Sequence, residues 1–155
     1  LNLSLIRHAK SDWSNYDGDD MARPISAKGV KKTKSILKFL EKKKKKYYSK
    51  KFFALLQKEP ETLDLLSEKI SNNPKIHFLD DLYYSSGVDI FRTVRLHASK
   101  NKVLVVSHEP LLSDSIGNFF IGSQNKNYLK AKEEYTTSAF FNVSFSCSDW
   151  DKIRK

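Results

Sequence analysis

Five short apolar runs alternate along the chain with segments in which apolar residues recur every three or four positions. Strands are expected at residues 2–6, 52–56, 75–79, 103–106 and 139–145. The run at 103–106 contains no polar residue, which is typical of a central parallel strand covered on both faces. The last run alternates apolar and polar residues, which predicts a half-buried strand nearer a sheet edge.

Helical periodicity occupies the intervals between these runs. Ser26 is the expected N-cap of a helix that reaches about Leu40. A second helix is expected from Pro60 to residues 72–74, and the spacing at 86–89 has the form of a capping box that starts a third. A fourth follows the central strand. The apolar positions that mark these last two helices are Val88, Phe91, Val94, Leu112, Ile116 and Phe119.

This alternation predicts an α/β fold, a three-layer α/β/α arrangement with a mostly parallel central sheet. The 155 residues suit one domain spanning 1–155, and we find no internal repeat. In sheets of this kind, ligands bind beyond the carboxyl ends of the strands. The residues that follow each strand are therefore the first candidates for a site.

The net charge of +10 comes from one segment of the chain. Residues 28–51 contain 12 lysines and one acid, Glu41, whereas the remainder has 16 basic and 17 acidic residues. Two interpretations stay open: a solvated connector, or a surface for an acidic partner or a phosphate-rich substrate. Lysine runs without arginine are weak evidence for sequence-specific nucleic-acid binding, so we expect no specific nucleic-acid partner.

The hydropathy, the single cysteine and the absence of metal-binding motifs narrow the class of protein further. No apolar run approaches the ~18–20 residues of a membrane span, so no span is expected. The single cysteine, Cys147, cannot form an internal disulfide, which favours a reducing, cytoplasmic compartment. The chain has neither a CxxC nor an HExxH motif, so we expect no metal and no cofactor. We expect a monomer.

Two of the predicted strands end on a histidine. Arg7 and His8 follow the first strand, and Ser107 and His108 follow the central one. Arginine offers a planar fork of donors that matches phosphate oxygens, a neutral imidazole can attack phosphorus, and a second imidazolium can stabilise the transferring oxygens. Either histidine alone could be an ordinary hydrogen-bonded residue at a strand end. The repeated pattern favours chemistry, with both histidines in one cleft.

Several stretches also resemble a known family. The stretch at 5–13, "LIRHAKSDW", resembles the signature of the histidine phosphatase superfamily, the phosphoglycerate-mutase-like enzymes. The stretch at 20–29, "DMARPISAKG", resembles the short SixA-like branch of phosphohistidine phosphatases. The stretch at 103–110, "VLVVSHEP", matches the second histidine of the family, which Asn-Pro usually follows. Residues 81–83 and 136–139 also resemble positions in that branch.

The resemblance implies a role for each matching residue. His8 is the nucleophile that accepts the phosphoryl group, Arg7 binds its oxygens, and His108 donates to the same oxygens. Arg23 closes the phosphate pocket, although a surface salt bridge near Asp20 is the alternative. The implied fold is phosphoglycerate-mutase-like, and the implied partner is a protein that carries phosphohistidine.

The chain departs from the family pattern at two positions. The second arginine is missing, and Lys58 falls where it should be; a lysine supplies charge without the bidentate fork. Asp81 is the best candidate for a general acid. Lys58 and Asp81 could equally be solvated loop residues.

The sequence therefore predicts a metal-independent phosphatase that acts on phosphohistidine in a protein. Imidazole is a better leaving group than an alkoxide, so the lack of a convincing acid favours P–N cleavage. One alternative is a phosphomonoesterase for small phosphorylated metabolites, with Asp81 as the acid. Another is a phosphate-binding module with weakened catalysis.

Overall fold

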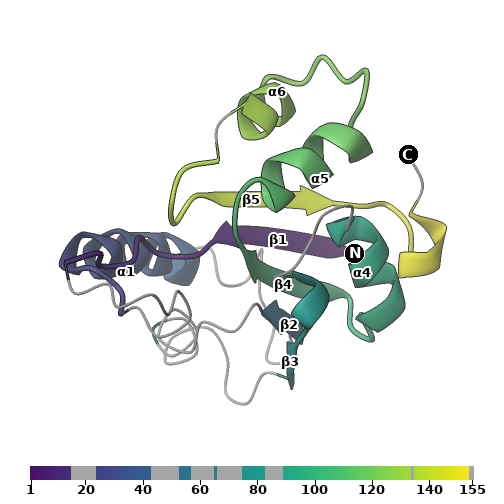
Figure 1. The fold of residues 1–155 in the computed structure, drawn as a ribbon. Helices are drawn as coiled ribbons and strands as arrows, with labels where there is room; N and C mark the ends of the chain where they lie inside the picture. Colours follow the sequence, from purple (N-terminus) through teal and green to yellow (C-terminus); the bar gives the residue numbers. More distant parts are fainter. Residues whose placement is uncertain are drawn as a thin grey trace.

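The structure is a computed structural model that describes residues 1–14, 24–42, 53–56, 65, 75–82, 89–133 and 135–153. Strands and helices alternate along these residues, as predicted (Figure 1). The strands are β1 (Asn2–Arg7), β2 (Phe53–Leu56), β3 (Lys75–Phe78), β4 (Lys102–Ser107) and β5 (Phe140–Ser144). The α-helices are α1 (Ala27–Lys42), α4 (Ile90–His97), α5 (Leu111–Phe119) and α6 (Lys126–Glu133), with 3-10 turns η1 (Asp80–Leu82) and η2 (Trp150–Lys152).

All five strands lie in one sheet, in the order β3-β2-β4-β1-β5. The pairings of β1 with β4, β2 with β4 and β2 with β3 are parallel, whereas β5 pairs antiparallel with β1. The uninterrupted apolar run became the central strand β4, and the alternating run became the edge strand β5. Both predictions from the hydrophobic pattern are confirmed.

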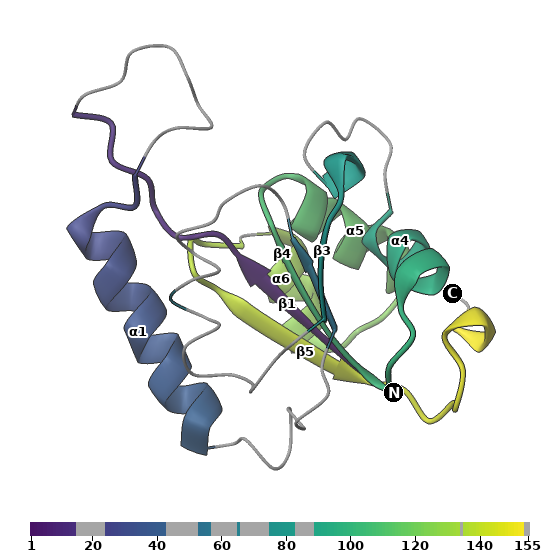
Figure 2. The same cartoon turned by 90° about the horizontal axis from the view of Figure 1, so that it is seen from below.

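Helices cover both faces of the sheet, because side chains of successive strand residues point to opposite sides. Leu3 and Leu5 of β1 belong to a core cluster with residues of α4, α5 and α6. Ile6 belongs to a second cluster with Leu37 and Leu40 of α1. Figure 2 shows α1 on one side of the sheet and α4 and α5 on the other, so the three-layer fold class is confirmed.

The start of α1 agrees with the sequence, but the start of α4 does not. The Ser26 hydroxyl accepts a hydrogen bond from the Gly29 N–H at 3.1 Å, as an N-cap does. In α4, the N-cap is Asp89, whose carboxylate accepts from the Phe91 N–H at 2.9 Å. The start predicted at residues 86–89 is wrong: the predicted capping box put Asp89 inside the first turn, whereas Asp89 has an extended backbone and is itself the N-cap.

Two helices differ from the prediction or cannot be compared with it. Helix α6 was not predicted, since Ala131 is the one residue of it that is buried and it therefore lacks an apolar stripe. The helix predicted from Pro60 to residues 72–74 lies outside the described residues, apart from the helical Leu65. Over the described residues, every helix is too short or too polar to span a bilayer.

Candidate active site

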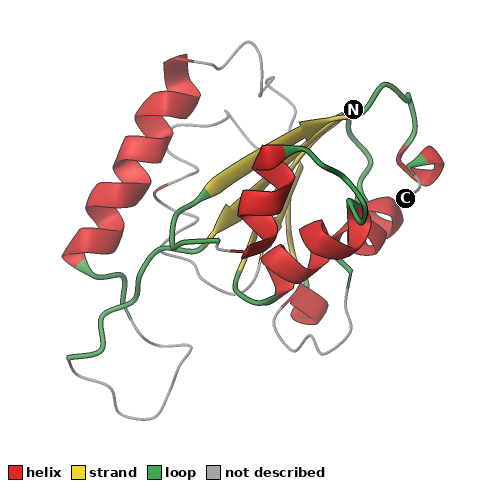
Figure 3. Ribbon diagram, turned by 90° about the horizontal axis from the view of Figure 1, so that it is seen from above, coloured by secondary structure: helices red, strands yellow, loops and turns green. Residues whose placement is uncertain are grey.

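The carboxyl ends of β1 and β4 lie side by side. These strands are parallel and in register, with Arg7 opposite Ser107, and neighbouring strands lie about 4.8 Å apart. The His8 N–H continues the ladder by donating to the Ser107 carbonyl at 2.9 Å. Arg7, His8 and His108 therefore lie together at the carboxyl ends of the parallel strands. Figure 3 shows loops at these strand ends, away from the N-terminus.

The ring of His8 is oriented by its own chain. Its Nδ1 atom lies 2.8 Å from the Ala9 carbonyl oxygen. A carbonyl oxygen can only accept, so Nδ1 carries a proton and, in the neutral ring, the lone pair is on Nε2. The ring is half-buried at the end of β1. This tautomer is the one that a nucleophile needs if it attacks through Nε2.

The guanidinium of Arg7 is held from the C-terminal part of the chain. Its Nη1 donates to the Tyr135 carbonyl at 2.8 Å. Its Nε is buried and has no hydrogen-bond partner among the described residues. A buried N–H without a partner is costly, and an oxyanion beside it would satisfy it. The geometry thus suits an anion pocket.

The segment from Tyr135 to Ala139 supports the end of β1. The Ser138 N–H lies 3.1 Å from the Arg7 carbonyl and 3.3 Å from the His8 carbonyl, and the Arg7 N–H donates to the Ala139 carbonyl at 3.2 Å. Ser138 is 1% exposed and has a φ of 56°, a left-handed conformation that a non-glycine residue adopts only when its surroundings hold it there. Sequence reasoning did not find these supporting contacts.

The environment of His108 changes its pKa. Burial lowers its pKa, and the nearby charge of Arg7 lowers it further, while a hydrogen bond to the Leu82 backbone acts in the opposite direction. The ring is therefore neutral at neutral pH. A neutral imidazole has one N–H, and the hydrogen bond to the Leu82 backbone uses it.

Glu109 is a further residue at this edge that the predicted site did not include. Burial raises the pKa of its carboxyl, although the Ser113 hydroxyl and the charge of Arg7 oppose the shift. Its Oε2 accepts a hydrogen bond from Ser113, and its Oε1 is buried without a partner in the described part of the chain. The sequence contains one clue to this residue: Glu109 occupies the position after the second histidine, where the resembling family usually has asparagine.

The remaining predicted site residues are described incompletely. Asp81 lies in η1, and the hydrogen bond from the Ser107 hydroxyl to the Leu82 carbonyl (3.2 Å) places this turn beside the end of β4. The side chain of Asp81 is outside the described atoms, and Arg23 and Lys58 are outside the described residues. Of the predicted set, the structure brings together Arg7, His8 and His108.

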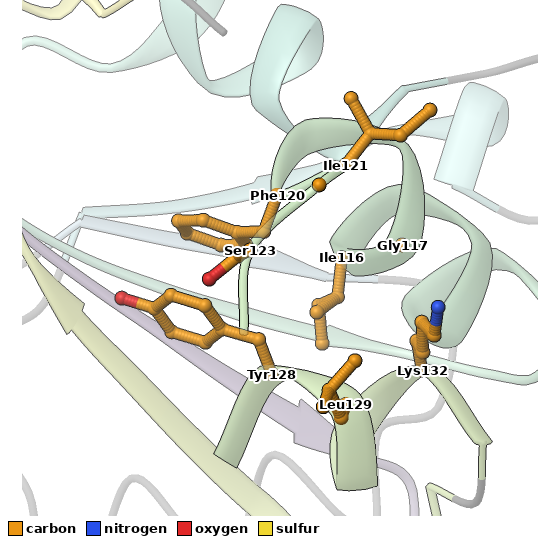
Figure 4. A pocket seen from close by; sticks show the side chains of 9 residues that line it. Ile116, Gly117, Phe120, Ile121, Ser123, Tyr128, Leu129 and Lys132 are labelled. Atoms are coloured by element: carbon orange, nitrogen blue, oxygen red, sulfur yellow. The ribbon is translucent and has the colours of Figure 1, made fainter. Parts of the chain in front are cut away.

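A separate pocket of about 50 Å³ lies between α5 and α6 (Figure 4). Such a volume holds a few water molecules at about 10–15 Å³ each. Its lining includes Ile116, Phe120, Tyr128 and Lys132, and none of the predicted site residues contributes to it. Among the residues that the structure describes, no three His, Cys, Asp or Glu side chains are grouped so that they could hold a metal ion.

Comparison with known proteins identifies the fold of the chain. No protein-family model and no curated protein sequence matches the chain. Solved structures do match it: the chain has the phosphoglycerate-mutase-like fold of the histidine phosphatases, as predicted.

Structures of the SixA branch are among the similar ones. A structure assigned to the phosphohistidine phosphatase SixA of Agrobacterium tumefaciens is 14% identical, with a TM-score of 0.76 over 94% of this chain and 91% of that one. The protein histidine phosphatase SixA in complex with tungstate is 18% identical, with a TM-score of 0.71 over 97% and 90%. A mycobacterial glucosyl-3-phosphoglycerate phosphatase is 14% identical, with a TM-score of 0.59 over 99% and 94%.

Proposed function

We propose that the chain is a metal-independent phosphatase that removes the phosphoryl group from phosphohistidine in a protein. The observation that carries this proposal is the in-register pairing of β1 with β4, which brings Arg7, His8 and His108 to one sheet edge. The SixA structures that share the fold are named for this activity, and one of them was obtained with tungstate, an oxyanion.

The reaction proceeds in two displacements. In the first, Nε2 of His8 attacks phosphorus, a new P–N bond forms, and the P–N bond to the substrate imidazole breaks. The substrate histidine leaves with the bonding electron pair and takes up a proton. In the second, water attacks the phosphoryl group on His8, which yields inorganic phosphate and returns the free imidazole.

The neighbouring residues stabilise the charge on the transferring group. Arg7 is held by the Tyr135 carbonyl and presents to one oxygen its Nε, which has no hydrogen-bond partner within the described part of the chain. His108 donates to another oxygen when its ring carries a second proton, because the single N–H of the neutral ring is used by the Leu82 backbone and the negative charge of the phosphoryl group favours the imidazolium. Arg23 and Lys58 complete the pocket in this proposal, with Lys58 as a single point charge in place of a fork.

One observation favours a second candidate, the hydrolysis of phosphate esters. An alkoxide leaving group needs a proton donor, and Glu109 is a carboxyl group with a raised pKa next to His108. In this reading Glu109, or Asp81, protonates the leaving oxygen. Replacement of Glu109 by glutamine should then slow aryl phosphate hydrolysis without slowing the release of phosphate from phosphohistidine.

The decisive experiment compares two substrates side by side. The chain is incubated with a protein phosphorylated on histidine and with an aryl phosphate, and rapid quenching traps the intermediate. We expect faster phosphate release from phosphohistidine and an acid-labile, base-stable label on His8. A label on serine or aspartate would refute the mechanism, faster release from the ester would favour the second candidate, and phosphate binding without turnover would indicate a binding module.

A further inference from the structure

Helix α1 presents one face that consists largely of lysine. Its buried residues, Gly29, Thr33, Leu37 and Leu40, face the protein. Its lysines are all exposed, and Glu41 is the helix's one acidic residue. The lysine face consists of Lys28, Lys31, Lys32, Lys34, Lys38 and Lys42.

Most of these lysines do not help the helix to form, although Lys42 in the last turn complements the helix dipole. Lys34 and Lys38, and Lys38 and Lys42, stand four residues apart, where like charges repel. The first turn contains no acid to complement the helix dipole. The lysines repel one another and are exposed to solvent. A partner with negative charges would remove this repulsion, so the lysine face is suited to bind one.

The lysine face is continuous with the candidate site. The Ser26 N–H donates to the Lys10 carbonyl at 2.9 Å, and a Cβ at Gly29 would lie 2.5 Å from the same oxygen. The Lys32 ammonium donates to the Thr136 hydroxyl at 3.3 Å. The first turns of α1 are therefore tied to the loop after His8 and to the segment that holds Arg7. From there, the 16-residue helix extends about 24 Å.

We propose that the lysine face of α1 is the docking surface for acidic side chains that flank the phosphohistidine on the protein substrate. This inference rests on the proposed function. The face begins beside the residues that receive the phosphoryl group, so a protein bound there presents its phosphohistidine to His8. Lysine ammonium groups are point charges and pair with carboxylates without demanding one geometry.

A nucleic acid fits this face less well than an acidic protein. Single-stranded nucleic acids bind where aromatic side chains offer stacking platforms beside the positive charge. Phe39 is the one aromatic residue of α1, and its ring packs edge-on against Phe140 with centroids 6.2 Å apart. The helix also lacks arginine, whose fork matches phosphate.

The test compares two charge-reversal triples. One carries K31E, K34E and K38E on α1, and leaves Lys32 in place because it contacts Thr136. The matched control carries K100E, K126E and K130E, which are equally exposed and belong to the other helical layer or its loops. Both triples change the net charge by the same amount. A second α1 variant, with glutamine at the three positions, keeps the test valid if the glutamate triple folds poorly.

Three substrates separate docking from chemistry. They are a short peptide with phosphohistidine among Glu and Asp residues, the same peptide with Gln and Asn, and free phosphohistidine. At about 0.01 M salt, where the Debye length is about 30 Å, we expect kcat/KM to favour the acidic peptide on the order of tenfold, the size expected from a few exposed ion pairs.

The α1 triple should lose this preference, the control triple should keep it, and turnover of free phosphohistidine should change by less than about twofold in both. Retention of the preference by the α1 triple, or equal loss in both triples, overturns the docking surface. Single-stranded DNA that competes with the acidic peptide at equal concentration and depends on the same lysines overturns the choice of partner.

Failure of the proposed function gives a different result. In that case free phosphohistidine is not turned over and no label appears on His8. Binding of the unphosphorylated acidic peptide, measured by fluorescence anisotropy, is still expected for the unaltered chain and lost in the α1 triple. If the unaltered chain turns over free phosphohistidine but does not bind the acidic peptide, the docking surface alone is overturned.

Discussion

The ends of β1 and β4 look alike in the sequence and differ in the structure. Each is an apolar strand that ends on a histidine, and the two strands run parallel and in register. The ring of His8 is oriented by the Ala9 carbonyl, next to it in the chain. The pKa of the His108 ring is lowered first by burial and then by Arg7, a residue of the other strand.

This difference separates the roles that the two rings can take. The contact with the Ala9 carbonyl holds a proton at Nδ1 of His8, and the proposed mechanism uses the lone pair on Nε2. The pKa of His108 is lowered first by burial and then by the charge of Arg7, while its ring is hydrogen-bonded to the Leu82 backbone. Similar motifs therefore acquire different chemistry from their surroundings, and Glu109 extends the second environment with a carboxyl group of raised pKa.

Replacement of His8 by alanine should have the largest effect. We expect turnover to fall by at least about 10⁴-fold, as when a covalent nucleophile is removed, and no phosphoenzyme to form. Rapid-quench labelling and steady-state phosphate release measure the two losses. His97→Ala, at an exposed histidine of α4, is the matched control and should leave both unchanged. Residual labelling in His8→Ala would transfer the nucleophile to another residue.

Replacement of His108 by alanine should slow the reaction without abolishing it. Loss of one preorganised donor typically costs about 10²–10³ in kcat, and the label on His8 should still appear. His108→Asn should recover part of the rate, because its amide restores an N–H donor. Pre-steady-state labelling of the three proteins measures this. Equal loss in His8→Ala and His108→Ala would mean that the two strand ends do not have distinct roles.

Replacement of Arg7 by lysine tests the charge that lies beside His108. Lysine keeps the charge and loses the fork and the contact with the Tyr135 carbonyl. We expect kcat/KM to fall by about 10–100-fold, since a hydrogen bond to a charged group contributes about 1.5–3 kcal/mol. Vanadate inhibition measures the parallel loss of oxyanion binding. Unchanged vanadate affinity would exclude Arg7 from the anion pocket.

Replacement of Glu109 by glutamine should have the smallest effect. The effect is on the stability of the folded protein, and it depends on pH. The folded protein raises the pKa of this carboxyl, so it favours the protonated form, and stability is lost as pH rises through the folded pKa. At about pH 7 the variant should be more stable than the unaltered chain by less than about 1 kcal/mol, because the group is partly exposed. Below about pH 4 both states are protonated, and the difference should vanish.

Urea unfolding at the two pH values measures this difference. Glu133→Gln, on the exposed surface of α6, is the control and should show no such dependence. A variant that is destabilised at about pH 7 would mean that the Glu109 carboxylate is stabilised by its neighbours rather than disfavoured by burial.

Most of the fold could be predicted because its signals are local. An apolar run predicts a strand wherever tertiary structure does not override it, and all five predicted strands formed. Helix α6 was missed because it buries little and so lacks an apolar stripe. The start of α4 was misplaced because the predicted capping box put Asp89 inside the first turn, whereas Asp89 is itself the N-cap.

The candidate site could be predicted in part for the same reason. His8, Arg7 and His108 were predicted as site residues because they follow apolar runs and match a family pattern, and the structure brings them to neighbouring strand ends. The contact between Arg7 and Tyr135 joins residues 128 positions apart, and no local pattern encodes it. Glu109 was passed over as a site residue because its position in the sequence says nothing about the burial that raises its pKa.

The sequence by itself determined the alternation of strands and helices, the two histidines at strand ends and the concentration of lysine on one helix. Each of these depends on the order of residues within a few turns or one strand. Only the tertiary structure decided that β1 and β4 are neighbours in register, that burial and Arg7 lower the pKa of His108, and that the lysine face begins beside the site. The physical reason is that burial, charge proximity and strand register are set by contacts between segments far apart in the chain.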